Sequence, residues 1–81
     1  KLVLGFSAET NDIIKNSRRK INEKNCDWLI ANDVSNLEIG FDSDFNEVSI
    51  LYKNGEIEKI YKDKKSVIAN KIVKKIVSNL E

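Results

Sequence analysis

The sequence has no histidine and only one cysteine, and both scarcities narrow the chemistry that it can perform. Without histidine, Ser-His and Cys-His nucleophile pairs and histidine metal sites are excluded within this chain. Cys26 cannot form an internal disulfide, which fits a reducing cytosol and favours a cytoplasmic location. We therefore interpret Cys26 as a small buried hydrophobe. No apolar run reaches the roughly 18–20 residues of a membrane span, so we expect no membrane partner.

Length and charge are those of one small globular unit. The chain has 81 residues, of which 33% are charged and 41% hydrophobic. Its formal net charge of +1 gives no general signal for a polyanion, so nucleic acid is not the expected partner. The chain lacks methionine and begins directly with an apolar strand, so we expect it to be a piece of something longer.

The first part of the sequence predicts a strand, a helix and a second strand. Residues 2–6 and 28–31 are short apolar runs typical of buried strands. The intervening helix, capped by Thr10 or Asn11 and stopped by Asn25, has one apolar face that comprises Ile13, Ile14, Ser17 and Ile21. This order is that of a β-α-β unit with parallel strands.

Polar residues follow both predicted strands. Parallel strands bring residues 7–10 and residues 32–34 to the same edge of the sheet, which is where open α/β sheets bind ligands. The alternative is that Asn32 and Asp33 only end the strand and begin a turn. A loop after Ser35 contains Phe41, which either plugs the rim of the core or packs on a ligand ring.

The remainder predicts a β-hairpin and an amphipathic helix. Asn54-Gly55 lies between two alternating apolar runs, residues 47–52 and 57–61, which is a strong hairpin signal. Residues 64–80 then repeat isoleucine or leucine at every fourth position, with Asp63 as a possible cap. Lys65 in the first turn opposes the helix dipole and therefore suggests an anion nearby. Lys71, Lys74 and Lys75 are interpreted as a solvated face.

These features favour a phosphate or nucleotide crevice. The helix amino terminus after residue 10 attracts anions, and Lys20, Lys24 and Lys65 are candidate charge partners. Neither a Gly-x-Gly-x-x-Gly nor a Walker A sequence is present. The carboxylate pairs Glu9/Asp12 and Asp42/Asp44 are better explained as caps or loop solvation than as metal ligands.

Four segments in order, GFSAETNDI, RRKINEKNCDWLIANDVS, GFDSDFNEVSIL and KKSVIANKIVKKI, together resemble phosphopantothenate–cysteine ligase. This enzyme is the synthetase half of the bifunctional coenzyme A biosynthesis flavoprotein, and the resemblance covers nearly all of residues 1–81. It implies an α/β fold: a Rossmann-like β-α-β unit, a β-hairpin and a carboxyl-terminal amphipathic helix within a larger three-layer domain.

The resemblance also implies a reaction. CTP activates the carboxylate of 4'-phosphopantothenate as an acyl nucleotidylate, and the amine of cysteine then attacks it. Mg²⁺ is expected with the triphosphate, FMN only in a separate decarboxylase domain, and a homodimer for the full-length protein. By correspondence with the family's motifs, Lys20 is the catalytic candidate, in a lysine-rich flap that ends at Lys24; the nucleotide-contact candidates are Ala8, Asp12, Lys20, Asn32, Gly40, Phe41 and Lys65.

Three departures from the family's pattern stand out: Asn22 and Glu23 replace more basic residues of the flap, and Ser7 stands where alanine is commoner. The family's domain is more than twice as long, so we expect this chain to be a carboxyl-terminal subdomain that is inactive alone. The alternatives are a non-catalytic nucleotide-binding or regulatory module and a small nucleic-acid-binding domain. The last would use Arg18-Arg19-Lys20 and the lysines of the final helix.

Overall fold

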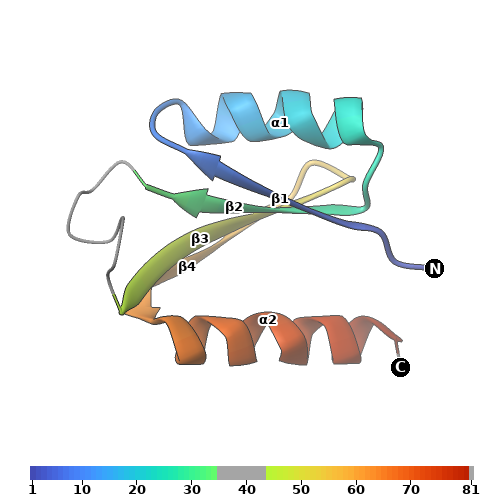
Figure 1. Ribbon diagram of the computed structural model, residues 1–81. Helices are drawn as coiled ribbons and strands as arrows, with labels where there is room; N and C mark the ends of the chain where they lie inside the picture. The colour runs from blue at the N-terminus through green and yellow to red at the C-terminus, as the bar shows by residue number, and fades with distance from the viewer. Residues whose placement is uncertain (35–43, 81) are drawn as a thin grey trace.

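The computed structural model describes residues 1–34 and 44–80 as a three-layer α/β unit (Figure 1). Its elements, in chain order, are β1 (Leu4–Glu9), α1 (Ile13–Lys24), β2 (Trp28–Asp33), β3 (Phe45–Tyr52), β4 (Ile57–Lys64) and α2 (Lys65–Leu80). The sheet has the order β1-β2-β3-β4, in which β1 and β2 are parallel and the other neighbours are antiparallel. The predicted fold class is therefore confirmed.

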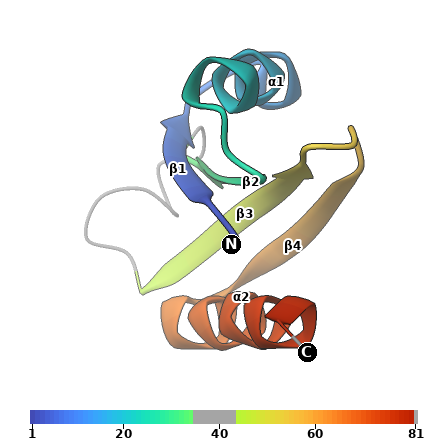
Figure 2. The same ribbon diagram turned by 90° about the vertical axis from the view of Figure 1, so that its right-hand side faces the viewer.

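The two helices cover opposite faces of the sheet (Figure 2). On the α1 face, Ile21 packs with Cys26, Leu29 and Leu51. On the α2 face, Ile68 packs with a larger cluster that comprises Trp28, Ile30, Val48, Ile50 and Ile60. Because successive strand residues point to opposite faces, Leu29 and Ile30 belong to different clusters. The burial of Cys26 agrees with its interpretation as a core residue.

The hairpin forms at the predicted Asn-Gly turn. The Tyr52 amide donates to the Glu56 carbonyl at 2.9 Å, and the Gly55 amide donates to the Tyr52 carbonyl at 2.9 Å. Gly55 has a φ of 95°, a backbone conformation that side chains with a Cβ rarely adopt. The turn therefore requires glycine at this position.

Helix boundaries are confirmed at one end of α1 and wrong at the other. Asn25 ends α1 in the left-handed conformation, as predicted. Neither Thr10 nor Asn11 caps its start, because Asp12 occupies the cap position with a left-handed backbone and its carbonyl accepts from the Asn16 amide. The prediction that Ile14 belongs to the buried apolar face of this helix is also wrong. Ile14 is 36% exposed, whereas Ser17 and Ile21 are buried.

The predicted cap of α2 is likewise wrong. Asp63 belongs to β4, where its side chain accepts from the Lys64 amide, and α2 follows β4 without a loop. The Lys65 amide donates instead to the Asp44 carbonyl at 2.8 Å. A backbone acceptor from the residue before β3 thus satisfies a helix-start amide that the sequence had suggested a side chain would cap.

Candidate functional site

The carboxyl ends of β1 and β2 lie side by side, as the sequence predicted. Ala8 pairs with Asn32 and Glu9 pairs with Asp33, and the Val34 amide donates to the Glu9 carbonyl at 2.9 Å. The reading of Asn32 and Asp33 as a turn is wrong, since both continue β2. Pairing with the last residues of β1 is the physical reason, because it gives these polar residues the hydrogen bonds of a strand.

Asn46 at the start of β3 extends this polar edge, and the sequence analysis missed it. Its side-chain amide donates to Asn32 Oδ1 at 2.9 Å, while its own Oδ1 accepts from the Glu47 amide at 2.9 Å. The Asn32 carboxamide is therefore oriented from the neighbouring strand. Only the antiparallel pairing of β2 with β3 could have revealed this contact, since the two asparagines are 14 residues apart.

Lys20 is attached to the end of β1 by an ion pair. Its ammonium lies 2.5 Å from Glu9 Oε2, and the Glu9 side chain is 5% exposed. One turn further along α1, the Lys24 ammonium donates to the Phe6 carbonyl at 3.2 Å. The lysine-rich segment is thus the last part of α1 and is anchored to β1 twice. The flap motion that the resemblance implies stays a prediction.

Glu9 remains ionised despite its burial. Burial by itself raises the pKa of a carboxyl group, but the Lys20 hydrogen bond and the Lys20 and Arg19 charges outweigh it and lower the pKa of Glu9. The Ser7 hydroxyl lies near the same carboxylate, yet it has no partner in hydrogen-bonding geometry, so we assign the lowering to the basic side chains. The sequence pattern favours Glu9 as a cap or loop residue, whereas in the structure it is the buried last residue of β1.

Lys65 and Asp12 lie at the same edge of the sheet. Strand β4 runs parallel to β2, so its carboxyl end and the first residue of α2 lie on the same side of the sheet as the carboxyl ends of β1 and β2, two strands away from β2 (Figure 1). Asp12 begins α1 at that edge and is exposed. Gly40 and Phe41 lie outside the described residues, as does Asp42. The described part of the candidate site therefore comprises Ala8, Glu9, Asp12, Lys20, Asn32, Asp33, Asn46 and Lys65.

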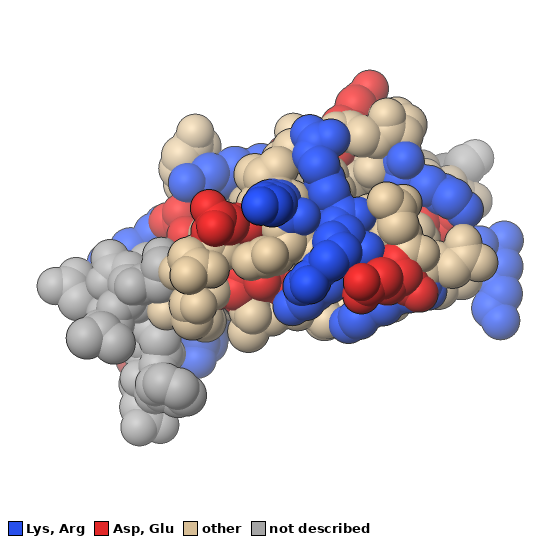
Figure 3. All heavy atoms as spheres, turned by 90° about the horizontal axis from the view of Figure 1, so that it is seen from above, with Lys and Arg blue, Asp and Glu red and all other residues tan. Residues whose placement is uncertain are grey.

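The electrostatics of the α1 side are predominantly basic. Figure 3 shows Lys and Arg side chains gathered across the middle of the surface seen from the α1 side, with acidic groups interspersed among them. Within residues 1–34 and 44–80, no three cysteine or acidic side chains converge as metal ligands would. Positive charge near the polar edge suits an anionic ligand, and the described side chains do not form a cage for a resident metal.

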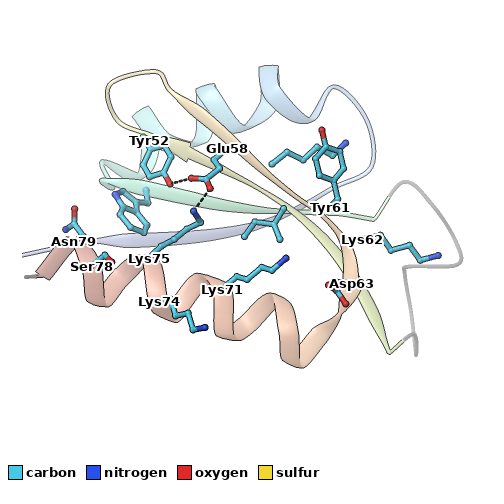
Figure 4. A pocket seen from close by; sticks show the side chains of 13 residues that line it. Tyr52, Glu58, Tyr61, Lys62, Asp63, Lys71, Lys74, Lys75, Ser78 and Asn79 are labelled. Atoms are coloured by element: carbon cyan, nitrogen blue, oxygen red, sulfur yellow. Dashed lines mark hydrogen bonds and ion pairs between the residues drawn. The ribbon is translucent and has the colours of Figure 1, made fainter.

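A pronounced groove lies elsewhere on the described structure. A groove of about 790 Å³ runs between β4 and the second half of α2, over Trp28 and Ile60 (Figure 4). Within it, Glu58 binds the Lys75 ammonium and accepts from the Tyr52 hydroxyl. Of the predicted site residues that the structure describes, none lines this groove. We place the candidate site at the polar edge because Lys20 pairs with Glu9 and Asn46 with Asn32 there.

Among the described residues, neither α1 nor α2 combines the length and the hydropathy that a membrane-spanning helix needs.

The Tyr52 phenol gives a testable signature of the groove. Burial, followed by the hydrogen bond and charge of Glu58, raises the pKa of Tyr52 to about 12 from its ordinary 10. The neutral phenol is favoured in the folded chain, so this stabilisation is present below pH 10 and is lost as the pH rises through about 12. Tyr61→Phe leaves Tyr52 as the only tyrosine, and we expect its tyrosinate absorbance to appear with a midpoint near 12. A midpoint at the ordinary value would contradict the partial burial of Tyr52 and its hydrogen bond to Glu58.

Comparisons with known proteins point to one family. The sequence family described as DNA/pantothenate metabolism flavoprotein C-terminal domain matches residues 1–80. A cysteine/cysteine sulfinic acid decarboxylase from an unknown prokaryotic organism is 32% identical over 78 residues, 96% of this chain and 22% of that protein. The coenzyme A biosynthesis bifunctional protein CoaBC of Vibrio vulnificus (strain CMCP6) is 40% identical over 73 residues, 90% of this chain and 18% of that protein.

A solved structure agrees with the sequence matches. The crystal structure of the C-terminal domain of a coenzyme A biosynthesis bifunctional protein CoaBC superposes with a TM-score of 0.75 and 30% identity. It covers 99% of this chain, which in turn covers 35% of the solved domain. The chain therefore spans about a fifth of the curated relatives and about a third of that domain.

Proposed function

Because this chain belongs to the DNA/pantothenate metabolism flavoprotein C-terminal domain family, we propose that it is the carboxyl-terminal part of a phosphopantothenate–cysteine ligase of coenzyme A biosynthesis. The observation that carries the proposal is the polar edge. Ala8, Asn32 and Lys20, which the resemblance assigned to the nucleotide, lie at this edge: Ala8 and Asn32 are strand neighbours, and Lys20 reaches the end of β1 through Glu9. Lys65 begins α2 on the same side of the sheet, two strands from β2. Residues 1–81 would form one wall of a crevice that binds CTP.

The proposed reaction uses this wall for positioning and charge stabilisation. The carboxylate of 4'-phosphopantothenate attacks the α-phosphorus of CTP and pyrophosphate leaves, which yields an acyl nucleotidylate. The amine of cysteine then attacks the acyl carbon and releases CMP. The Lys20 ammonium would stabilise the negative charge that develops on the phosphate oxygens during the first step, while the amide of Asn32 and the backbone at Ala8 orient the nucleotide.

Mg²⁺ would enter this reaction as part of the substrate. A divalent cation neutralises triphosphate charge when it is bound, and the described residues of this chain offer no converging ligand set of their own. FMN has no part in the ligation and belongs to the separate decarboxylase domain of bifunctional members. A homodimer for the full-length protein and a cytoplasmic location remain predictions from the resemblance and from the single cysteine.

The surface supports the idea that residues 1–81 act within a larger domain. Phe6 on the edge strand β1 is 59% exposed, and α2 carries further exposed apolar side chains at Val73, Val77 and Leu80. Such residues on a small unit indicate contacts with more polypeptide. We therefore propose that the isolated 81 residues lack ligase activity.

A hybrid protein tests the proposed function. Residues 1–81 replace the matching segment of the Vibrio vulnificus CoaBC relative; this protein is called the hybrid ligase below. We expect release of pyrophosphate and formation of phosphopantothenoylcysteine only when CTP, 4'-phosphopantothenate and cysteine are all present. The isolated chain, at equal concentration, should give neither product.

The name of one relative supplies a competing outcome. Since that relative is a cysteine/cysteine sulfinic acid decarboxylase, the same assay should follow CO₂ release from cysteine without CTP. A hybrid that binds CTP but releases no pyrophosphate would instead favour the non-catalytic nucleotide-binding module. The proposed ligase would be overturned by CO₂ release from cysteine without CTP, and equally by CTP binding without pyrophosphate release.

A further inference from the structure

Glu9 is the only charged side chain that is buried among residues 1–34 and 44–80. It ends the edge strand β1, and its side chain lies on the α1 face beside Lys20. Neither the proposed reaction nor the nucleotide contacts described above use it. A buried carboxylate at the rim of a candidate site therefore requires its own explanation.

The ion pair with Lys20 constrains both partners. Removing the partner of a buried carboxylate is costly, because the charge is then left without compensation in a poorly hydrated place. Lys20 consequently stays on Glu9 even when an anionic ligand approaches the edge. An ammonium group has three donors, so the contact at 2.5 Å leaves two N–H groups of Lys20 for other acceptors.

A second contact fixes the direction of α1 relative to β1. The Lys24 ammonium donates to the Phe6 carbonyl, three residues before Glu9 on the same strand. Lys20 and Lys24 are four residues apart and hence neighbours on one side of the helix. With both anchored to β1, the Lys20 ammonium is held beside the carboxyl end of this strand.

We propose that Glu9 is a positioning residue that holds the Lys20 ammonium at the carboxyl end of β1 and directs its two remaining N–H groups toward an anionic oxygen of the reacting nucleotide. This inference rests on the proposed ligase function. It assigns to Glu9 an effect on turnover that acts through Lys20, without contact between Glu9 and the substrate.

The Glu58–Lys75 pair provides a matched control. It also joins a strand carboxylate to a helix lysine, but it lies on the α2 face, in the groove that none of the described site residues lines. Its carboxylate is well exposed, with a side-chain exposure of 45%. Glu58→Gln therefore removes a similar ion pair without touching the polar edge.

The experiment compares Glu9→Gln, Glu9→Asp and Glu58→Gln in the hybrid ligase. For Glu9→Gln we expect kcat to fall by about 10-fold to 10²-fold while the KM for CTP changes little. The reason is that a displaced Lys20 ammonium stabilises the transition state less well but affects binding of the ground-state nucleotide little. Trace acetylation of lysine amines should label Lys20 several-fold faster, since its ammonium is released to solvent. Glu9→Asp, which keeps the carboxylate, should recover part of both properties, and Glu58→Gln should change neither.

The outcomes separate the two proposals. An inactive hybrid ligase overturns the proposed function, and this inference with it. An active hybrid in which Glu9→Gln leaves kcat unchanged overturns only the positioning role. A fall in kcat with unchanged Lys20 labelling also overturns it, because the loss would then not pass through Lys20.

Discussion

In the hybrid ligase, Lys20→Ala is expected to lower kcat by about 10²–10³-fold, the loss found when one preorganised electrostatic contact to a developing charge is removed. The lost interaction would be specific to the transition state, because negative charge on the phosphate oxygens of CTP increases as pyrophosphate departs. The KM for CTP should rise much less than kcat falls. Steady-state pyrophosphate release at varied CTP concentration measures both constants.

Lys71→Ala is the matched control for this substitution. Lys71 is also a helical lysine, but it belongs to α2 and lines the groove beside β4. We expect its replacement to leave kcat and KM within about twofold of the unmodified hybrid, an effect of less than ~0.5 kcal/mol. Equal losses for the two variants would contradict the assignment of Lys20, since they would reflect a general dependence on surface charge.

Ile50→Ala is expected to remove most of the stability of the 81-residue chain in water at 25 °C. Ile50 is 0% exposed and packs between strand neighbours and Ile68 of α2. Truncating a buried isoleucine to alanine costs about 2–5 kcal/mol, through lost burial and through the cavity that remains. A unit of 81 residues has a free energy of unfolding near the lower end of about 5–15 kcal/mol, so the loss removes most of its stability. Urea denaturation followed by Trp28 fluorescence measures the change.

Ile57→Ala makes the same chemical change at the edge of the same hairpin. Ile57 is 38% exposed, so we expect a loss of about 1 kcal/mol or less. Trp28 packs edge-to-face on Tyr52, with ring centroids 5.1 Å apart, and reports on the folded state in both variants. An Ile50→Ala chain with an unchanged denaturation midpoint would contradict the proposed core.

Much of the fold could be predicted because its signals are local. The apolar runs around Leu29 and Ile50 predicted strands, Asn54-Gly55 predicted the turn, and the four-residue repeat from Ile68 predicted α2. Each depends on side chains a few residues apart, which the sequence displays directly. The sequence also predicted that residues 7–10 and residues 32–34 lie together. The two strands of a β-α-β unit run in the same direction, so their carboxyl ends lie at the same edge of the sheet.

The details of the candidate site could not be predicted because they depend on register. Glu9 is buried only because Lys20 on α1 reaches the end of β1, 11 residues away in the sequence. Asn46 meets Asn32 only because β3 turns back beside β2. Asp12 replaces Thr10 or Asn11 as the cap because the chain adopts a left-handed backbone there. None of these contacts leaves a periodic pattern in the sequence.

Hydrogen–deuterium exchange of the hybrid ligase with and without CTP and Mg²⁺ tests most directly whether the nucleotide binds at the carboxyl edge of the sheet. We expect CTP to slow exchange in peptides that cover residues 8–13 and 32–34, where Ala8 and Asn32 are strand neighbours. Residues 71–79 are the part of α2 that contributes to the groove beside β4, and exchange across them should not change. Protection confined to residues 71–79, with none at residues 8–13 or 32–34, would contradict the proposed nucleotide site.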